Sequence, residues 1–179
     1  MEHEQHGLAH LDAPWRMEYI EQAEKAEACI FCAKPCEEET CDNKNYIVHR
    51  GEHCFIILNA YPYNSGHLMV IPYQHAADLS ALPPETCLEM MRLAAIAMEA
   101  LKRIMSPDGF NLGMNLGRAG GAGISEHMHL HVVPRWVGDT NFMTTVAQAR
   151  VLPESLERTW EKVRAAVQEA LAQEASATS

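Results

Sequence analysis

The sequence predicts a single α+β domain built on a mostly antiparallel β-sheet. Short strand-like segments come before and after one long helical pattern, without the strand–helix–strand alternation of a parallel sheet. The 179 residues have room for one hydrophobic core, and 47% hydrophobic with 21% charged residues is a globular composition. The formal net charge of −10 argues against a nucleic-acid partner, which needs clustered positive charge, but permits a small anionic ligand.

Five segments carry the strand pattern between turn signals. They span residues 46–49, 54–58, 66–71, 110–116 and 127–133. Gly51 and Glu52 stand between the first two segments, where they fit a hairpin turn.

Two helices are expected in and after the sheet region. The first opens at Pro83–Glu85, because proline suits a first helical turn, and ends near Met105. Its two apolar stripes predict a largely buried helix; they are Leu88, Met91, Ala95 and Met98, and Met90, Ala94, Ala97 and Leu101. The second helix follows Pro153 and has one apolar face, formed by Leu156, Trp160, Val163, Val167 and Leu171.

The chain divides into three parts. Residues 1–28 are expected to form a polar leader and a helix, residues 29–140 the main domain, and residues 141–179 a C-terminal extension whose helix packs on that domain. Within the main domain, the polar residues 33–45 predict a loop. No apolar run approaches the ~20 residues of a membrane span, and no signal-peptide core follows the charged N-terminus. We therefore expect a cytoplasmic protein with no membrane partner.

Three histidines, His127, His129 and His131, alternate with apolar residues in the last strand-like segment. Side chains on a strand alternate between its faces, so these imidazoles are expected to share one face. The core-facing residues of the same segment are then Met128, Leu130 and Val132. Burying three imidazoles without a purpose would cost several kcal/mol, so the pattern predicts a functional site.

Two chemistries fit this histidine pattern. Alternating histidines on a strand are a common metal-binding arrangement, which would make a metal hydrolase with zinc on the three imidazoles. The alternative is nucleophilic catalysis on phosphorus. The glycine-rich loop at residues 117–123 favours the second chemistry, because its backbone N–H groups can converge on an anion directly before the histidines.

The cysteines point to a separate metal site. Cys29 and Cys32 have the spacing of a ligand pair, and Cys36 and Cys41 follow closely enough to complete a four-cysteine site. Without a metal, Cys29 and Cys32 would pack around Phe31.

The segment His127-Met128-His129-Leu130-His131-Val132-Val133 resembles the signature of the histidine triad (HIT) family. The resemblance covers roughly residues 29–136. It extends through residues 29–32, 58–60 and 66–72 and Asn115, while residues 59–64 and 134–142 resemble the branch that acts on diadenosine tetraphosphate.

The resemblance implies a HIT-like fold, a five-stranded antiparallel sheet with a long central helix and a C-terminal helix, and a homodimer. It implies cleavage of a dinucleoside polyphosphate at the α-phosphate, with His129 forming a nucleotidyl-histidine intermediate. His131 would bind the phosphate oxygens, and His127 would complete the catalytic triad. The nucleotide-binding residues implied in the same way are Ile30, Phe31, Leu58, Asn59, Asn115, Gly121, Gly123 and Ile124.

Bacterial members of the family also imply a structural zinc site. The matching ligands are Cys29, Cys32, His75 and His127, a set we prefer over the four-cysteine alternative. No organic cofactor is implied.

One position departs from the family pattern. Gly123 stands where the diadenosine phosphorylases carry a serine. Water and inorganic phosphate therefore both stay open as the final acceptor. The remaining alternatives are a nucleoside phosphoramidate hydrolase and a noncatalytic nucleotide-binding module.

Overall fold

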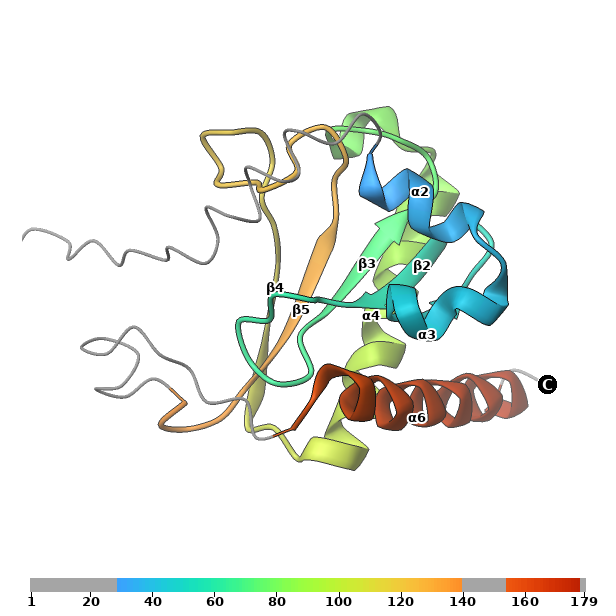
Figure 1. Ribbon diagram of the computed structural model, residues 1–179, viewed down its shortest axis with the longest axis vertical. Helices are drawn as coiled ribbons and strands as arrows, with labels where there is room; N and C mark the ends of the chain where they lie inside the picture. The colour runs from blue at the N-terminus through green and yellow to red at the C-terminus, as the bar shows by residue number, and fades with distance from the viewer. Residues whose placement is uncertain (1–28, 140–153, 178–179) are drawn as a thin grey trace, which may run out of the picture.

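The computed structural model describes residues 29–139 and 154–177, and an antiparallel sheet organises them (Figure 1). The sheet has five strands in the order β1-β2-β3-β5-β4, and every neighbouring pair is antiparallel. The strands are β1 (Ile47–Arg50), β2 (Cys54–Leu58), β3 (Leu68–Pro72), β4 (Gly109–Met114) and β5 (Leu130–Arg135). The predicted α+β class and antiparallel sheet are confirmed.

Helices cover both faces of this sheet. The α-helices are α2 (Ile30–Cys36), α3 (Asp42–Asn45), α4 (Pro84–Met105) and α6 (Leu156–Ala177), and the 3-10 turns are η1 (Glu39–Cys41) and η2 (Leu79–Ala81). The predicted helix before residue 29 lies outside the described residues. None of the described helices is long and apolar enough to cross a membrane.

The prediction of a loop over residues 33–45 is wrong, because α2 and α3 occupy most of that segment. Their polar sequences carry little helical signal. Short helices gain most of their stability from tertiary packing, and α2 is held by Phe31, which is buried against the sheet.

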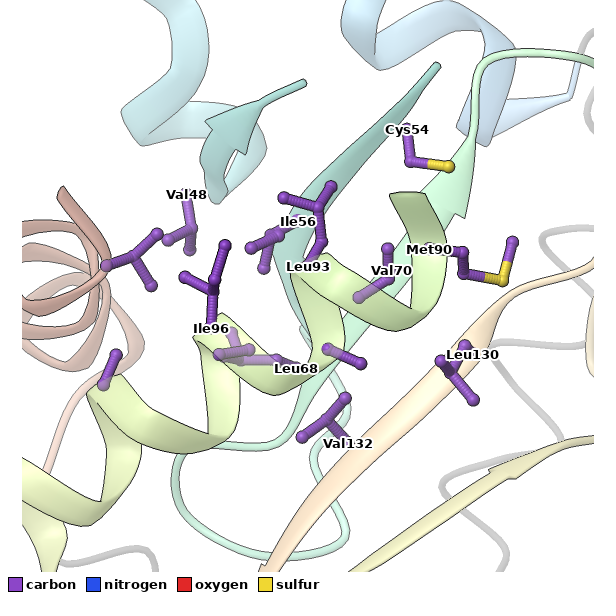
Figure 2. Close-up of a cluster of buried hydrophobic side chains, with 14 of the residues drawn as sticks. Val48, Cys54, Ile56, Leu68, Val70, Met90, Leu93, Ile96, Leu130 and Val132 are labelled. Atoms are coloured by element: carbon purple, nitrogen blue, oxygen red, sulfur yellow. The ribbon is translucent and has the colours of Figure 1, made fainter. Parts of the chain in front are cut away.

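The core divides into two layers because strand side chains alternate. On β2, Ile56 and Leu58 point toward α4, whereas Phe55 and Ile57 point to the opposite face, where they pack with Phe31. Figure 2 shows strand residues such as Ile56 and Val132 directed at α4. α6 adds Val163 and Val167 to the same cluster.

Only one of the two apolar stripes of α4 is buried in the chain. Met90 and Leu101 belong to the buried stripe, as predicted, and have no exposed surface. Leu88 and Met91 belong to the other stripe, and they are 72% and 53% exposed. The prediction that both stripes are buried is therefore wrong for the single chain, because the sheet reaches only one side of the helix.

β5 begins three residues later than the sequence pattern predicts. Its ladder with β3 starts at Leu130, which pairs with Val70. Before that point the chain leaves the ladder, and the Met128 N–H donates to the carbonyl of Ala76 over 2.7 Å. The predicted core positions are nevertheless confirmed, because the side chains of Met128, Leu130 and Val132 are buried.

A buried carboxylate joins the N-terminal part of the domain to α6. Asp42 is 3% exposed and accepts hydrogen bonds from Nε and Nη2 of Arg50 at 3.1 and 2.7 Å. Arg164 on α6 donates to the other carboxylate oxygen over 3.3 Å. Removing one partner of such a buried pair leaves the other charge uncompensated.

Replacing Asp42 should therefore destabilise the fold strongly. We expect Asp42→Ala to lower the free energy of unfolding by about 3 kcal/mol, measured by urea denaturation. Glu174→Ala is the matched control, because it breaks an exposed ion pair with Arg92 and should cost less than about 1 kcal/mol. Equal losses in the two variants would contradict the role given to Asp42.

Candidate functional site

His129 is held in one orientation and one tautomer. Its Nδ1 lies 3.0 Å from the carbonyl oxygen of His127. A carbonyl can only accept, so Nδ1 carries the proton and Nε2 keeps its lone pair. The ring is 5% exposed, and the ring of Phe31 packs on it at a centroid distance of 5.1 Å. His129 therefore presents an unprotonated Nε2, as a nucleophile requires.

Burial also keeps His129 neutral. Desolvation lowers its pKa below the ordinary value of 6.5, although the hydrogen bond to the His127 carbonyl works in the opposite direction. The charged imidazolium is disfavoured in a site that water reaches poorly. Neutral imidazole is the reactive form near neutral pH.

His131 has the opposite tautomer, set by His67. The Tyr63 N–H donates to Nδ1 of His67 over 3.0 Å, so the His67 proton must lie on Nε2. That atom lies 2.9 Å from Nδ1 of His131 and donates to it. The proton of neutral His131 is therefore on Nε2, which makes this atom a hydrogen-bond donor. His67 is fully buried, and its contacts give it a positioning role for His131.

A small cavity brings most of the expected residues together. The cavity has a volume of about 40 Å³, and both His129 and His131 line it. Six further residues of the cavity wall were expected as nucleotide-binding residues or lie in the segment 59–64 that carries the family resemblance. They are Asn59, Tyr61, Tyr63, Asn115, Gly123 and Ile124. Met69 completes the lining, and its place follows from the β3–β5 register, which pairs it with His131.

Of the other expected nucleotide-binding residues, two lie on the same side of the sheet as the cavity, and Leu58 lies on the opposite side. Phe31 and Ile30 belong to the apolar cluster on the site side of the sheet, next to Ile124. Gly121 lies in the glycine-rich loop with a φ of +80°, a conformation that favours glycine. The structure places Leu58 in the other cluster, against α4. Ile57 faces the site side in its place, because neighbouring strand residues alternate.

His127 belongs to a second site. Its Nε2 donates to the carbonyl of Pro72 over 2.9 Å, so Nδ1 keeps its lone pair. Nδ1 lies 3.3 Å from Sγ of Cys29 and 3.5 Å from Sγ of Cys32. Nδ1 of His75 lies 3.3 Å from the same Cys32 sulfur. The tautomer of His127 is the one that a metal ligand needs.

These four residues fit a tetrahedral zinc ion. Their ligand atoms lie within 4.8 Å of one another, and zinc bonds of roughly 2.0–2.3 Å separate neighbouring ligand atoms by roughly 3.3–3.8 Å. Burial and the nearby Cys29 thiol raise the pKa of Cys32 to about 11. A bound cation would reverse this effect, because ligation deprotonates the thiol.

The other metal sites weighed from the sequence are not assembled in the described part of the chain. Cys36 donates to the carbonyl of Cys32 over 3.1 Å, and neither Cys36 nor Cys41 joins the cluster. His129 and His131 do not join it either, because Nδ1 of His127 points toward the cysteines.

The antiparallel fold and its histidine-lined cavity define a class of nucleotide hydrolases and transferases. The family model described as HIT domain matches residues 41–137. The AP-4-A phosphorylase of Mycobacterium tuberculosis (strain ATCC 25618 / H37Rv) is 38% identical over 157 residues, which cover 85% of this chain and 80% of that protein. The chain therefore belongs to the histidine triad family, and it is an enzyme of the nucleotidyl hydrolase or phosphorylase type.

Solved structures agree with this assignment. A Zn-bound histidine triad family protein from Mycobacterium smegmatis has a TM-score of 0.65 at 30% identity, covering 82% of this chain and 97% of that one. The diadenosine triphosphate hydrolase of Plasmodium falciparum has a TM-score of 0.56 at 15% identity, covering 85% and 95%. The second likeness shows a shared fold.

The lowered pKa of His129 makes stability depend on pH. Below about pH 6.5, His129 is protonated in the unfolded chain but still neutral in the folded one, because its folded-state pKa is lower. The free energy of unfolding therefore keeps its full value above that pH and decreases as the pH falls below it. We expect acidification from about pH 7.5 to 5.5 to destabilise the wild type more than His129→Gln, measured by urea denaturation. Equal losses would show that His129 titrates alike in both states.

Proposed function

We propose that this enzyme cleaves a dinucleoside polyphosphate, with diadenosine tetraphosphate as the leading candidate, through a nucleotidyl-histidine intermediate on His129. The observation that carries the proposal is the pair of tautomers in the cavity. His129 offers a lone pair on Nε2, and His131 offers a proton on its own Nε2. A nucleophile beside a hydrogen-bond donor suits attack on a phosphorus whose oxygens gain negative charge.

In the first half-reaction, Nε2 of His129 forms a bond to the α-phosphorus. The bond from that phosphorus to its bridging oxygen breaks, and the remaining nucleotide leaves with the bonding electrons. Asn115, on the cavity wall just after β4, and the backbone of the glycine-rich loop would hold the phosphate oxygens. Asn59 would hold the ribose hydroxyls from the other side.

In the second half-reaction, an acceptor oxygen attacks the nucleotidyl group and the phosphorus–nitrogen bond breaks. We propose inorganic phosphate as this acceptor. The support is the 38% identical relative named as an AP-4-A phosphorylase. With diadenosine tetraphosphate the products would then be ATP and ADP.

We also propose that Cys29, Cys32, His75 and His127 hold a structural zinc ion. The support is the spacing of their ligand atoms and a structural neighbour whose title describes it as Zn-bound. All four positions are filled by protein, which is typical of structural rather than catalytic zinc. Such an ion would tie α2 to the segment after β3 and to His127.

We also propose that the chain forms a homodimer, as the family implies. The exposed stripe of α4 supports it, because Leu88 and Met91 present apolar surface that a second copy could cover.

Product analysis tests the reaction. We expect diadenosine tetraphosphate to yield ATP and ADP only when phosphate is added, with His129→Ala reducing turnover by at least about 10³-fold. His53→Ala is the control, because it removes a histidine outside the cavity. AMP and ATP without added phosphate would establish water as the acceptor instead. Full turnover by His129→Ala would rule out this nucleophile.

Metal analysis tests the zinc site. We expect one zinc per chain in the wild type, none in Cys32→Ser, and a melting temperature lowered by about 10 °C on chelation or in that variant. Cys36→Ser is the matched control, since its exposed thiol lies outside the cluster, and it should keep both zinc and stability. Loss of zinc from Cys36→Ser alone would favour the four-cysteine site.

A further inference from the structure

A second and larger cavity adjoins the catalytic one along β4 and β5. We call it the trough. Its volume is about 410 Å³, within the range of pockets that hold nucleotide-sized ligands. Its lining comes from β4 and β5, from Asn115 just after β4 and from the loop before β3; the residues that matter below are Asn111, Gly113, Asn115, His131 and Arg135.

The trough and the catalytic cavity are joined at His131. Both are lined by this residue, by Tyr63 and by Asn115. A group that leaves the phosphorus beside His129 and His131 therefore has a continuous path into the trough. The part of the trough that extends from His131 to Arg135 lies outside the cavity lined by His129.

Gly113 opens the passage between the two cavities. It pairs with His131 across the β4–β5 ladder, so a side chain at position 113 would project on the same face as the imidazole. A Cβ built on Gly113 meets no atom within 4 Å. The absence of a side chain therefore leaves space beside the catalytic histidine that a larger residue would fill.

The far end of the trough carries a fixed guanidinium group. Arg135 lies four residues beyond His131 on β5, a distance of roughly 13 Å along the strand. Nε and Nη2 donate to Asp139 at 2.6 and 2.8 Å, and Nη1 donates to Oδ1 of Asn111 over 2.6 Å. These contacts hold the guanidinium group through its N–H edges, and the Arg135 side chain is 42% exposed. A guanidinium plane held by its edges suits stacking with a planar ring.

Asn111 is oriented by the same contact. Its oxygen accepts from Arg135, so its NH₂ group is left to donate elsewhere along the trough. Together with Asn115 nearer His131, it gives two amide side chains between the reacting centre and the guanidinium group. This sequence of donors followed by a flat cation matches a phosphate chain followed by a base.

We propose that the trough binds the leaving nucleotide of the dinucleotide substrate, with its phosphates along Asn115 and Asn111 and its base at Arg135. This inference rests on the proposed cleavage of a dinucleoside polyphosphate. Residues of β4 and β5 would then determine the preference for substrates with a large leaving group, since a substrate with a small leaving group would not use the trough.

The test compares two substrates in the same variants. One is diadenosine tetraphosphate, and the other is adenosine 5′-phosphoramidate, whose leaving group is ammonia. We expect Gly113→Val to lower the ratio of kcat/KM for the dinucleotide to kcat/KM for the phosphoramidate at least tenfold. Ala165→Val is the control, because it adds a branched side chain at an exposed position of α6 outside the trough lining, and its ratio should equal that of the wild type.

A second variant tests the trough independently, in case Gly113→Val disturbs the fold. Asn111→Ala removes a donor from an exposed position and should also lower the ratio, with a melting temperature close to that of the wild type. Ratios within twofold of the wild type in both variants would overturn the trough assignment while leaving the proposed reaction intact. Wild-type turnover of the phosphoramidate alone would overturn both the dinucleotide substrate and the trough, and turnover of neither would overturn the reaction as well.

Discussion

The hydrogen bond from Nδ1 of His129 to the carbonyl of His127 connects the chemistry of the site to its fold. It fixes the tautomer that exposes the Nε2 lone pair, and it depends on the backbone of His127 being held still. The ring of His127 provides that restraint by donating to the carbonyl of Pro72, the last residue of β3. The orientation of His129 therefore depends on the end of a central strand, and a shift of that strand end would reorient Nε2 of His129.

His127 also links the two sites. The backbone carbonyl of His127 holds the His129 ring, and the His127 side chain faces Cys29, Cys32 and His75. Phe31 lies between them, with its ring against both His127 and His129. A metal ion at the cluster would hold α2 and Phe31 in place and so contribute to the dry surroundings that lower the pKa of His129. In this arrangement a bound metal would stabilise the cavity without touching the substrate.

Much of the fold was predictable from local pattern. The alternation of apolar residues located the strands of the sheet and the core positions of β5, and the proline pair placed the start of α4 within Pro83–Glu85, where the structure has it at Pro84. Features set by contacts between distant residues were not predictable. The helical state of α2 comes from burial of Phe31, and the late start of β5 comes from the bond between Met128 and Ala76.

The same limit applies to the site. The spacing of His127, His129 and His131 and the family resemblance pointed to residues that the structure does bring together. The proton positions needed the tertiary structure, because the tautomer of His131 follows from His67, the residue just before β3. The prediction that Leu58 binds the nucleotide was wrong for a simpler reason. A resemblance assigns a strand to a pocket, but the side-chain alternation of the strand decides whether Ile57 or Leu58 faces it.

Capture of the covalent intermediate tests the central claim most directly. The enzyme would be mixed with diadenosine tetraphosphate without phosphate, quenched under alkaline denaturing conditions that preserve a phosphorus–nitrogen bond, digested and analysed by mass spectrometry. We expect a nucleotidyl group on the peptide that contains residues 127–131, assigned by fragmentation to His129 and absent from His129→Gln. A group on His127 or His131, or turnover with no adduct at any time point, would contradict the proposed nucleophile.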